Sequence, residues 1–228
     1  MSILSKVEIQ ARLKLEITDE KSLVITPPPR AKAFDCDSVD LRLGCHFLMP
    51  QMPPEPRWGS AQVRGHSHTR VHVPLGSYFV VPSHETVLGA TLEFIKLPKD
   101  LSGQILTKSS VARCFMVIET APWIHPLYRG CLTLEIANVS NTPLTIFPGL
   151  PIAQLVLLRN NNAAELEMPE GSYVGPVYPE EPLRKVLGKE MHKAGIVQYR
   201  DPATGDWYPS SNIDTTCDSS HTGSHTQK

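Results

Sequence analysis

The stretch GSYFVVPSHETVLGATLEFIKLPKDLSGQILTKSS, residues 76–110, decides the fold class. Its apolar residues come in short runs interrupted by Pro82, Pro98 and Gly103, a pattern typical of three or four short strands joined by turns. Further strand-like runs follow in FMVIET, CLTLEIAN, LTIF and IAQLVLL. Regular short strands of this kind predict an all-β domain, built as a sandwich or barrel.

A short helix is expected at the N-terminus. Ser5 followed by Glu8 matches the capping box that starts a helix, and Val7, Ile9 and Leu13 can share one face. We therefore expect this helix to pack on the outside of the β core.

Upstream of the decisive stretch, SVDLRLG at residues 38–44 alternates apolar and charged side chains and predicts a half-buried strand. Asp40 and Arg42 lie two residues apart and would share a strand face, where a charge pair or a contact with a neighbouring subunit is possible. A structural role is the favoured interpretation for both.

Four regions follow from these patterns. We expect an N-terminal helix and linker at 1–30 and a β domain at 31–158. An atypical C-terminal segment at 159–200, with a helix over 183–195, would pack on the core or on a neighbouring subunit. The polar stretch 201–228 has little to bury and is expected to be disordered.

Charge and cysteine content narrow the function classes. The formal net charge is −1 with acids and bases mixed along the chain, which argues against a nucleic-acid partner and a membrane surface. No run approaches the roughly 20 apolar residues that span a bilayer. Five cysteines without a C-x-x-C pair suit a reducing compartment, so we expect a cytoplasmic protein.

Three histidines at even spacing, His66, His68 and His72, invite a metal-site interpretation because they would share a face of an extended chain. No carboxylate or cysteine accompanies them at ligand spacing. Solvated histidines on a loop or edge strand are the favoured reading, and no metal ligands are predicted.

One carboxylate stands out in the strand CLTLEIAN, residues 131–138. Alternation puts Leu132, Leu134 and Ile136 on one face and Glu135 on the other, among small residues. A confined pocket there would raise the pKa of Glu135 toward the range useful for proton transfer near neutrality. The alternative is a glutamate that faces solvent or pairs with an arginine of another strand.

The segment KSSVAR brings two cations and two hydroxyls into six residues after a turn. Lys108, Ser109, Ser110 and Arg113, together with backbone N–H groups, suit an oxyanion such as phosphate. A serine that caps a helical turn beside a solvated arginine is the alternative.

Taken together, these motifs carry a family resemblance. The order SVDLRLG, TKSSVARCFMVIETA, IHPLYRGCLTLEIAN and FPGLPIAQL resembles the dCTP deaminase branch of the dUTPase superfamily, over the region from the N-terminal helix to about Leu158. The resemblance implies a distorted β-barrel or jelly-roll (dUTPase-like, β-clip) and a homotrimer with nucleotide sites where subunits meet. It also implies metal-independent deamination of a cytosine deoxynucleotide, dCTP to dUTP plus ammonia.

By the same resemblance, Glu135 is the general acid and base, while Ser109 and Arg113 orient it and stabilise developing charge. The backbone carbonyl of Ala121 would help to hold the attacking water. The implied nucleotide contacts are Lys108, Ser110, His125, Thr133, Leu134, Gln154 and Tyr173. Any Mg²⁺ would be carried by the triphosphate and not by protein ligands.

Three departures from the family pattern keep alternatives open. His125 stands where the family has an aspartate, which makes dUTPase or bifunctional activity less favoured. Lys108 replaces the commoner arginine, so a point contact replaces a bidentate one. A closing K-Y-x-G-Q segment is not found, and Tyr173 is the candidate lid aromatic. The alternatives are a dUTPase, a bifunctional enzyme, and an inactive nucleotide-binding sensor.

Overall fold

The structure is a computed structural model of the 228-residue chain, and it describes residues 2–50, 68–119, 121–160, 176–179, 198–200 and 207–209. The chain divides into two compact units, each described by itself. The first unit comprises residues 1–50 and 68–180, and the second comprises residues 51–67 and 181–228. Every predicted site residue that lies in the described ranges belongs to the first unit.

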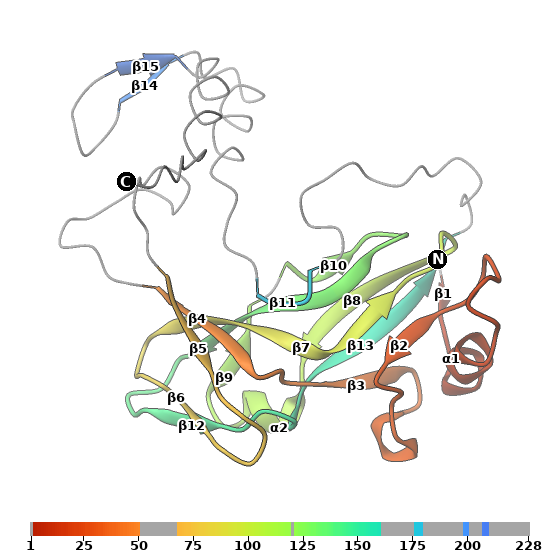
Figure 1. Cartoon of the computed structure of the whole chain (residues 1–228), viewed down its shortest axis with the longest axis horizontal. Coiled ribbons are helices and arrows are strands. Elements are labelled where there is room, and N and C mark those ends of the chain that lie inside the picture. The colour runs from red at the N-terminus through yellow and green to blue at the C-terminus, as the bar shows by residue number, and fades with distance from the viewer. Residues whose placement is uncertain are drawn as a thin grey trace, which may run out of the picture. The chain divides into compact units, whose positions relative to one another are not determined.

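The first large sheet of this unit has five antiparallel strands (Figure 1). Its main path runs β1-β13-β8-β10, and β3 pairs with β13. The bounds are β1 Ser2–Ile3, β3 Ser38–Arg42, β8 Leu101–Thr107, β10 Trp123–Ile124 and β13 Pro151–Arg159.

A second sheet of six antiparallel strands follows the path β5-β4-β7-β11-β9, and β2 pairs with β7. Its bounds are β2 Val24–Thr26, β4 His46–Pro50, β5 His68–His72, β7 Thr86–Lys96, β9 Met116–Ile118 and β11 Arg129–Asn138. The strand β11, which carries Glu135, therefore lies between β7 and β9.

The remaining helices and strands of the described residues are short. They are the 3₁₀ turn η1 Ala31–Ala33, the helix α2 Ser109–Ala112, the pair β6 Phe79–Val81 and β12 Leu144–Ile146, and, in the second unit, the pair β14 Gln198–Arg200 and β15 Trp207–Pro209. β15 lies within 201–228, the stretch predicted to be disordered.

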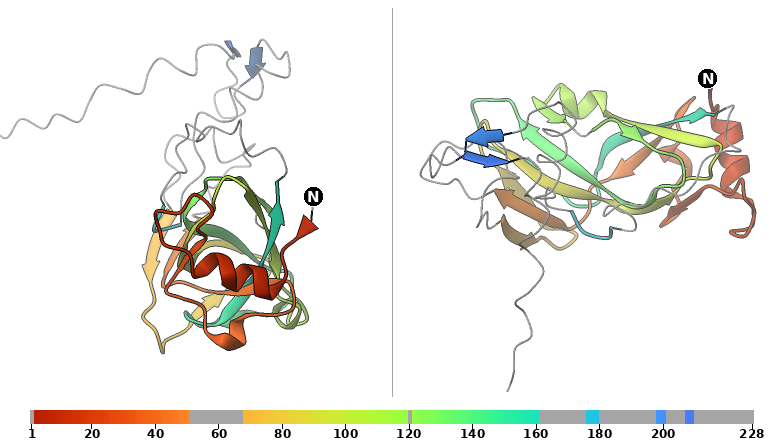
Figure 2. Two further views of the ribbon diagram at one scale, coloured as in Figure 1. Left: turned by 90° about the vertical axis from the view of Figure 1, so that its right-hand side faces the viewer. Right: turned by 90° about the horizontal axis from the view of Figure 1, so that it is seen from above.

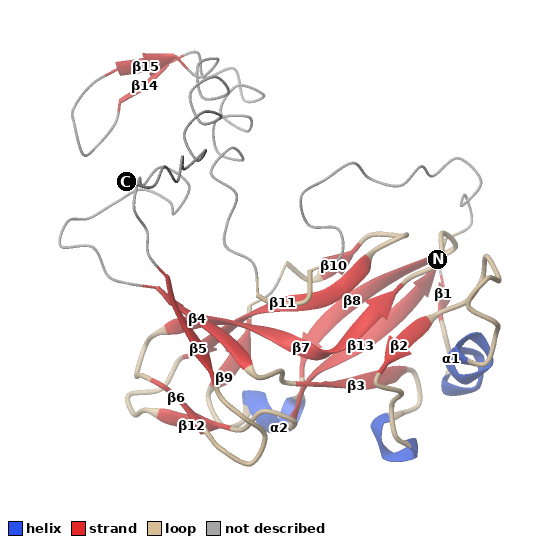
Figure 3. Ribbon diagram, viewed as in Figure 1, coloured by secondary structure: helices blue, strands red, loops and turns tan. Residues whose placement is uncertain are grey.

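One hydrophobic core joins the two large sheets. It contains side chains from both, including Leu41 and Leu155 of the first sheet and Ile95, Leu134 and Ile136 of the second, all of which are fully buried. Strands dominate the described part of the unit (Figure 3), and the two sheets are distorted and do not close into a barrel there. The prediction of an all-β fold with a short N-terminal helix is confirmed.

The N-terminal helix α1, Lys6–Leu13, lies across one end of the strands (Figure 2). The capping box is present: Oε2 of Glu8 accepts hydrogen bonds from the backbone N and the hydroxyl of Ser5, at 2.9 and 2.8 Å. Ile9 is buried and Leu13 packs against the core, but Val7 is 74% exposed. The prediction for Val7 is wrong because the inward stripe runs through residues four apart, 9 and 13.

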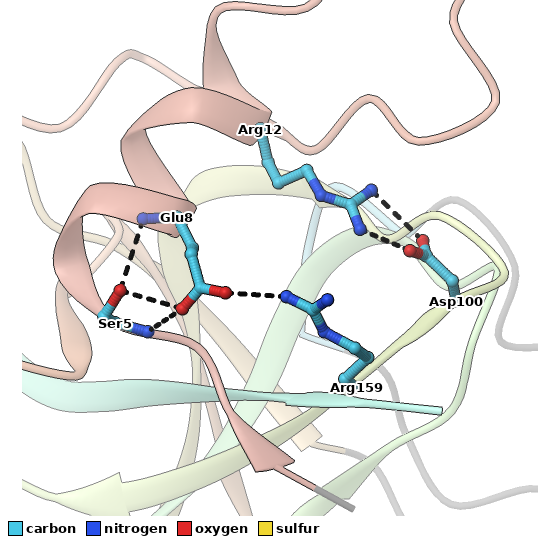
Figure 4. A network of polar contacts seen from close by, with 5 residues as sticks. All are labelled: Ser5, Glu8, Arg12, Asp100 and Arg159. Carbon is cyan, nitrogen blue, oxygen red and sulfur yellow. Dashed lines mark hydrogen bonds and ion pairs between the residues drawn. The ribbon is translucent and has the colours of Figure 1, made fainter. Parts of the chain in front are cut away.

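Two ion pairs anchor α1 to the first sheet (Figure 4). Arg159 donates to Glu8 at 2.7 Å, and Arg12 pairs with Asp100. The hydrogen bonds from Ser5 are the main reason that the pKa of the exposed Glu8 carboxyl lies below its ordinary value, and Arg159 lowers it further. The helix is thus fixed at the sheet end where β13 stops. No helix in the described part of the chain is long and apolar enough to cross a membrane.

Candidate functional site

The segment KSSVAR forms a tight turn between β8 and β9. Lys108 is extended, with φ −63° and ψ 132°, and starts the one-turn helix α2; Arg113 closes it through a hydrogen bond from its N to Ser109 O at 3.1 Å. Phe115 then takes the left-handed conformation, with φ 62°, and the chain turns back into β9. Ser109, Ser110 and Arg113 are all exposed, so the turn presents hydroxyls and a guanidinium to its surroundings.

A threonine closes the base of this turn. The Thr107 hydroxyl accepts a hydrogen bond from the Ile118 N at 2.9 Å and lies 3.3 Å from the Ile118 O, to which it donates. The last residue of β8 is thereby joined to the last residue of β9. Two strands fix both ends of the turn, although it contains little regular structure itself.

Glu135 lies in the middle of β11 on the face turned away from the core. Leu134 and Ile136 are fully buried on the other face, as the alternation predicted. The Glu135 side chain is half-buried, and its Oε2 atom is shielded from solvent. Thr133 and Ala137 flank it on the same face. One oxygen of the carboxylate is therefore sheltered within a single chain.

β9 links the strand of Glu135 to the KSSVAR turn. The amide of Glu119, which follows β9, donates to the Glu135 carbonyl at 2.8 Å, and Ile118 pairs with Ile136. On the other side of the strand, Glu135 is the partner of Leu88 in β7. Because α2 packs against β9 (Figure 1), the turn and the glutamate strand both contact β9.

An irregularity between β7 and β11 precedes Glu135. Cys131 pairs with Phe94 and Thr133 pairs with Ala90, so Leu132 lies opposite a widened part of β7. The Leu132 amide donates to the Thr91 hydroxyl at 2.9 Å, and that hydroxyl donates to the Glu93 carbonyl at 2.8 Å. Thr91 thus satisfies a buried amide that the ladder leaves unpaired.

Replacing Thr91 with valine is expected to lower the free energy of unfolding by about 1–3 kcal/mol, because the buried Leu132 amide loses its acceptor while the side-chain shape is kept. Urea denaturation measures the loss, and hydrogen exchange should accelerate at Leu132. Thr145→Val, the same change at an exposed position of β12, is the matched control and should change stability by less than about 0.5 kcal/mol. Equal stability of the two variants would contradict this role.

A buried ion pair supports the same region. Glu93, 1% exposed, accepts hydrogen bonds from the backbone N of Arg42 at 2.8 Å and from its Nε at 2.6 Å. Burial raises the pKa of the Cys131 thiol, and the Glu93 charge raises it further, so this thiol stays protonated. Arg42 therefore has the structural role that the sequence favoured, with a partner on β7 and not on its own strand.

Asp40 also has a partner from another segment. Its Oδ2 and Oδ1 lie 2.6 and 2.7 Å from Nζ of Lys108. Gln154 of β13 is the strand partner of Asp40 on one side and of Leu106 on the other. Lys108 and Gln154, both predicted nucleotide contacts, thus lie in one neighbourhood.

The other predicted site residues are dispersed. Ala121 and His125 are exposed on either side of β10, and Thr133 is half-buried beside Glu135. The side chain of Leu134 is fully buried in the core, so only its main chain could contact a nucleotide. Tyr173 lies outside the described residues.

Within the part of the chain that the structure describes, the histidines form no group that could hold a metal ion. His68 and His72 lie at the two ends of β5, and His66 lies outside the described residues. The ring of His72 is 4.8 Å from that of His46, whose pKa is lowered by burial and then by the charge of His72. No group of three or more His, Cys, Asp or Glu side chains in the described ranges could hold a metal ion.

Sequence reasoning missed the roles of Thr91 and Thr107. Each hydroxyl bridges two segments, and neither carries a motif. Asp40 was noticed through its strand alternation with Arg42, but its partner could not be read from spacing. The four described cysteines, Cys36, Cys45, Cys114 and Cys131, are free thiols.

Comparisons with known proteins agree with this architecture. A family model described as dCTP deaminase-like matches residues 3–160. A dCTP deaminase, dUMP-forming, of Rhodococcus opacus is 41% identical over 129 residues, which cover 56% of this chain and 68% of the relative. The corresponding protein of Mycolicibacterium paratuberculosis is 40% identical over the same length and coverage.

A solved structure gives the fold. The crystal structure of 2'-deoxycytidine 5'-triphosphate deaminase from Agrobacterium tumefaciens aligns with a TM-score of 0.53 and 18% identity, over 86% of this chain. The chain spans about half of that protein, 54% of its length. The family match extends from β1 through β13 and includes both the KSSVAR turn and β11, and on this basis the chain belongs to the dCTP deaminase-like family.

Proposed function

We propose that this protein catalyses the hydrolytic deamination of dCTP, with Glu135 as the general acid and base. The observation that carries the proposal is the solvent-shielded Oε2 of Glu135, on the strand that pairs with β9, which also contacts the KSSVAR turn. The relatives named as dCTP deaminases support the choice of cytosine as the base.

In the proposed reaction, Glu135 takes a proton from water as the water oxygen bonds to ring carbon 4. Glu135 gives this proton to ring nitrogen 3, then takes the remaining proton from the new hydroxyl on carbon 4 and gives it to the amino group. The carbon–nitrogen bond breaks, and ammonia leaves a uracil ring. A positioned proton shuttle of this kind contributes about 100- to 10,000-fold in rate. Ser109 and Arg113 would orient the carboxylate and stabilise developing charge, and the Ala121 carbonyl would hold the water.

The triphosphate would bind Lys108 and Ser110, with Gln154 beside them and His125 near the sugar. Charge-assisted hydrogen bonds to phosphate are worth roughly 1.5–3 kcal/mol each, so a few of them suffice for specific binding. Mg²⁺ would arrive with the triphosphate as part of the substrate.

We also propose a homotrimer with sites at subunit interfaces. The exposure of Ser109, Arg113 and Ala121 in one chain is consistent with groups that meet a ligand or a neighbouring subunit. Sedimentation equilibrium would test this: a mass other than three times 25.2 kDa contradicts it. A cytoplasmic location remains a prediction from the cysteines.

A second candidate, bifunctional chemistry, is favoured by the names of the relatives, which form dUMP. It needs a second hydrolysis, in which water attacks the α-phosphorus of dUTP and pyrophosphate leaves. His125 stands where the family has an aspartate, and an imidazole does not provide a base of the same charge. We therefore expect dUTP as the main product.

The test is incubation of purified protein with dCTP and Mg²⁺, with ammonia measured and nucleotides separated by chromatography. Ammonia with dUTP is the expected result. Release of ammonia together with dUMP and pyrophosphate would instead identify a bifunctional enzyme. Calorimetric binding of dCTP without ammonia release would identify a nucleotide-binding sensor. If dCTP neither binds nor releases ammonia, the proposed function is wrong.

A further inference from the structure

The ion pair between Asp40 and Lys108 joins β3, which has no part in the proposed function, to the KSSVAR turn, which has one. Asp40 lies on β3 and Lys108 at the start of the KSSVAR turn, 68 positions later. Both carboxylate oxygens contact Nζ, at 2.7 and 2.6 Å. The side chains are only 12% and 27% exposed, so the pair is partly desolvated. Both N–O distances are well below the roughly 4 Å at which a surface ion pair is counted.

The backbone fixes both partners before the side chains meet. The Lys108 amide donates to the Ile152 carbonyl at 3.2 Å, which holds the start of the turn against β13. Asp40, Gln154 and Leu106 are matched across β3, β13 and β8, so their side chains share one face. Asp40 is therefore aimed at the place where the turn begins.

From this geometry we propose that Asp40 is a positioning residue for the nucleotide phosphates, acting through Lys108. An ammonium group has three N–H donors, and the two contacts to Asp40 leave one for an incoming phosphate oxygen. The inference rests on the proposed function, because it takes Lys108 to be a phosphate contact.

Two effects of Asp40 on an anionic ligand oppose each other. Its negative charge repels phosphate, whereas its hold on Lys108 keeps a long, flexible side chain in one place. Asp40 is the more buried partner, and Lys108 is followed directly by the exposed Ser109 and Ser110. A phosphate oxygen that accepts the third N–H of Lys108 contacts the ammonium and not the carboxylate, so the repulsion acts over a longer distance than the Lys108 contact, and positioning prevails.

The test is a double-mutant cycle with dCTP and Mg²⁺, read by calorimetry. Asp40→Asn is expected to weaken dCTP binding about tenfold, the loss of one charge-assisted contact. Lys108→Met should weaken it at least as much, and Asp40→Asn should then have no further effect in the Lys108→Met background. Binding of deoxycytidine, which lacks phosphates, should not change.

Controls separate positioning from folding. Glu8→Gln removes an ion pair of similar length, 2.7 Å, on α1 and should leave dCTP affinity unchanged. Asp40→Glu keeps the charge and should recover part of the affinity lost in Asp40→Asn, with thermal unfolding followed for every variant. Unchanged or tighter dCTP binding by Asp40→Asn, or an equal loss in the Lys108→Met background, overturns the proposal.

Failure of the proposed function would look different. If the wild-type protein binds dCTP but releases no ammonia, the proposal of deamination fails, but the double-mutant cycle still tests the role of Asp40. If the wild-type protein binds neither dCTP nor dUTP, the role of Asp40 is overturned together with the function.

Discussion

Glu135→Gln is expected to lower the rate of dCTP deamination by about 100- to 10,000-fold, the usual contribution of a positioned general acid and base. Glutamine keeps the shape of the side chain on β11 but cannot take a proton from water. Because dCTP would still contact Lys108 and Ser110, calorimetry should give an affinity within a few fold of wild type. The loss should therefore fall on kcat, measured by ammonia release at saturating dCTP.

A neighbouring carboxylate provides the matched control. Glu119 is bonded through its amide to the Glu135 carbonyl, and its side chain is exposed. Glu119→Gln makes the same chemical change one strand away and should keep most of the activity. Full activity of Glu135→Gln, or an equal loss in both variants, would show that Glu135 is not the proton shuttle.

The second large effect is expected on stability. Glu93→Leu should lower the free energy of unfolding by about 3 kcal/mol, because it removes both acceptors from Arg42 and leaves a partly buried guanidinium unpaired. The estimate is at the low end for buried pairs because the Arg42 side chain is 28% exposed and can regain some hydration. Urea denaturation monitored by fluorescence measures the change.

Removing the partner as well should restore part of this loss. In the double variant Glu93→Leu with Arg42→Met, no charge is left unpaired, so its stability is expected to lie between the single variant and wild type. Recovery should stay incomplete because the backbone amide of Arg42 has still lost its acceptor. A single variant as stable as wild type would contradict a supporting role for this ion pair.

Much of the fold was predictable because its signals are local. Alternating side chains predicted β3 and β11, short apolar runs between turn residues predicted β7 and β13, and the Ser5–Glu8 capping box predicted the start of α1. Leu132, Leu134 and Ile136 of β11 are buried as predicted, although Cys131 and Ala137 on the other face are buried too. Strand periodicity and helix capping depend on neighbours a few residues apart, which a sequence displays directly.

The polar partners were not predictable for the opposite reason. Lys108 meets Asp40, and Arg42 meets Glu93, across separations of 68 and 51 residues, and several other acids and bases would have fitted equally well. The choice depends on the strand order β3-β13-β8 and on the contact of β3 with β7, which spacing does not encode. The roles of Glu135 and Arg113 came from family resemblance, and the Glu135→Gln variant tests the first of them.

The register shift between β7 and β11 restricts how β11 can change in length. Between the pairs Cys131–Phe94 and Thr133–Ala90, β11 advances two positions while β7 advances four, so β7 accommodates an even-numbered insertion and both strands keep their facing. Deleting a single codon between 131 and 134 would instead rotate the remainder of β11 by half a repeat, sending Glu135 inward and Leu134 outward. Homologues that differ in length here should therefore do so in steps of two residues.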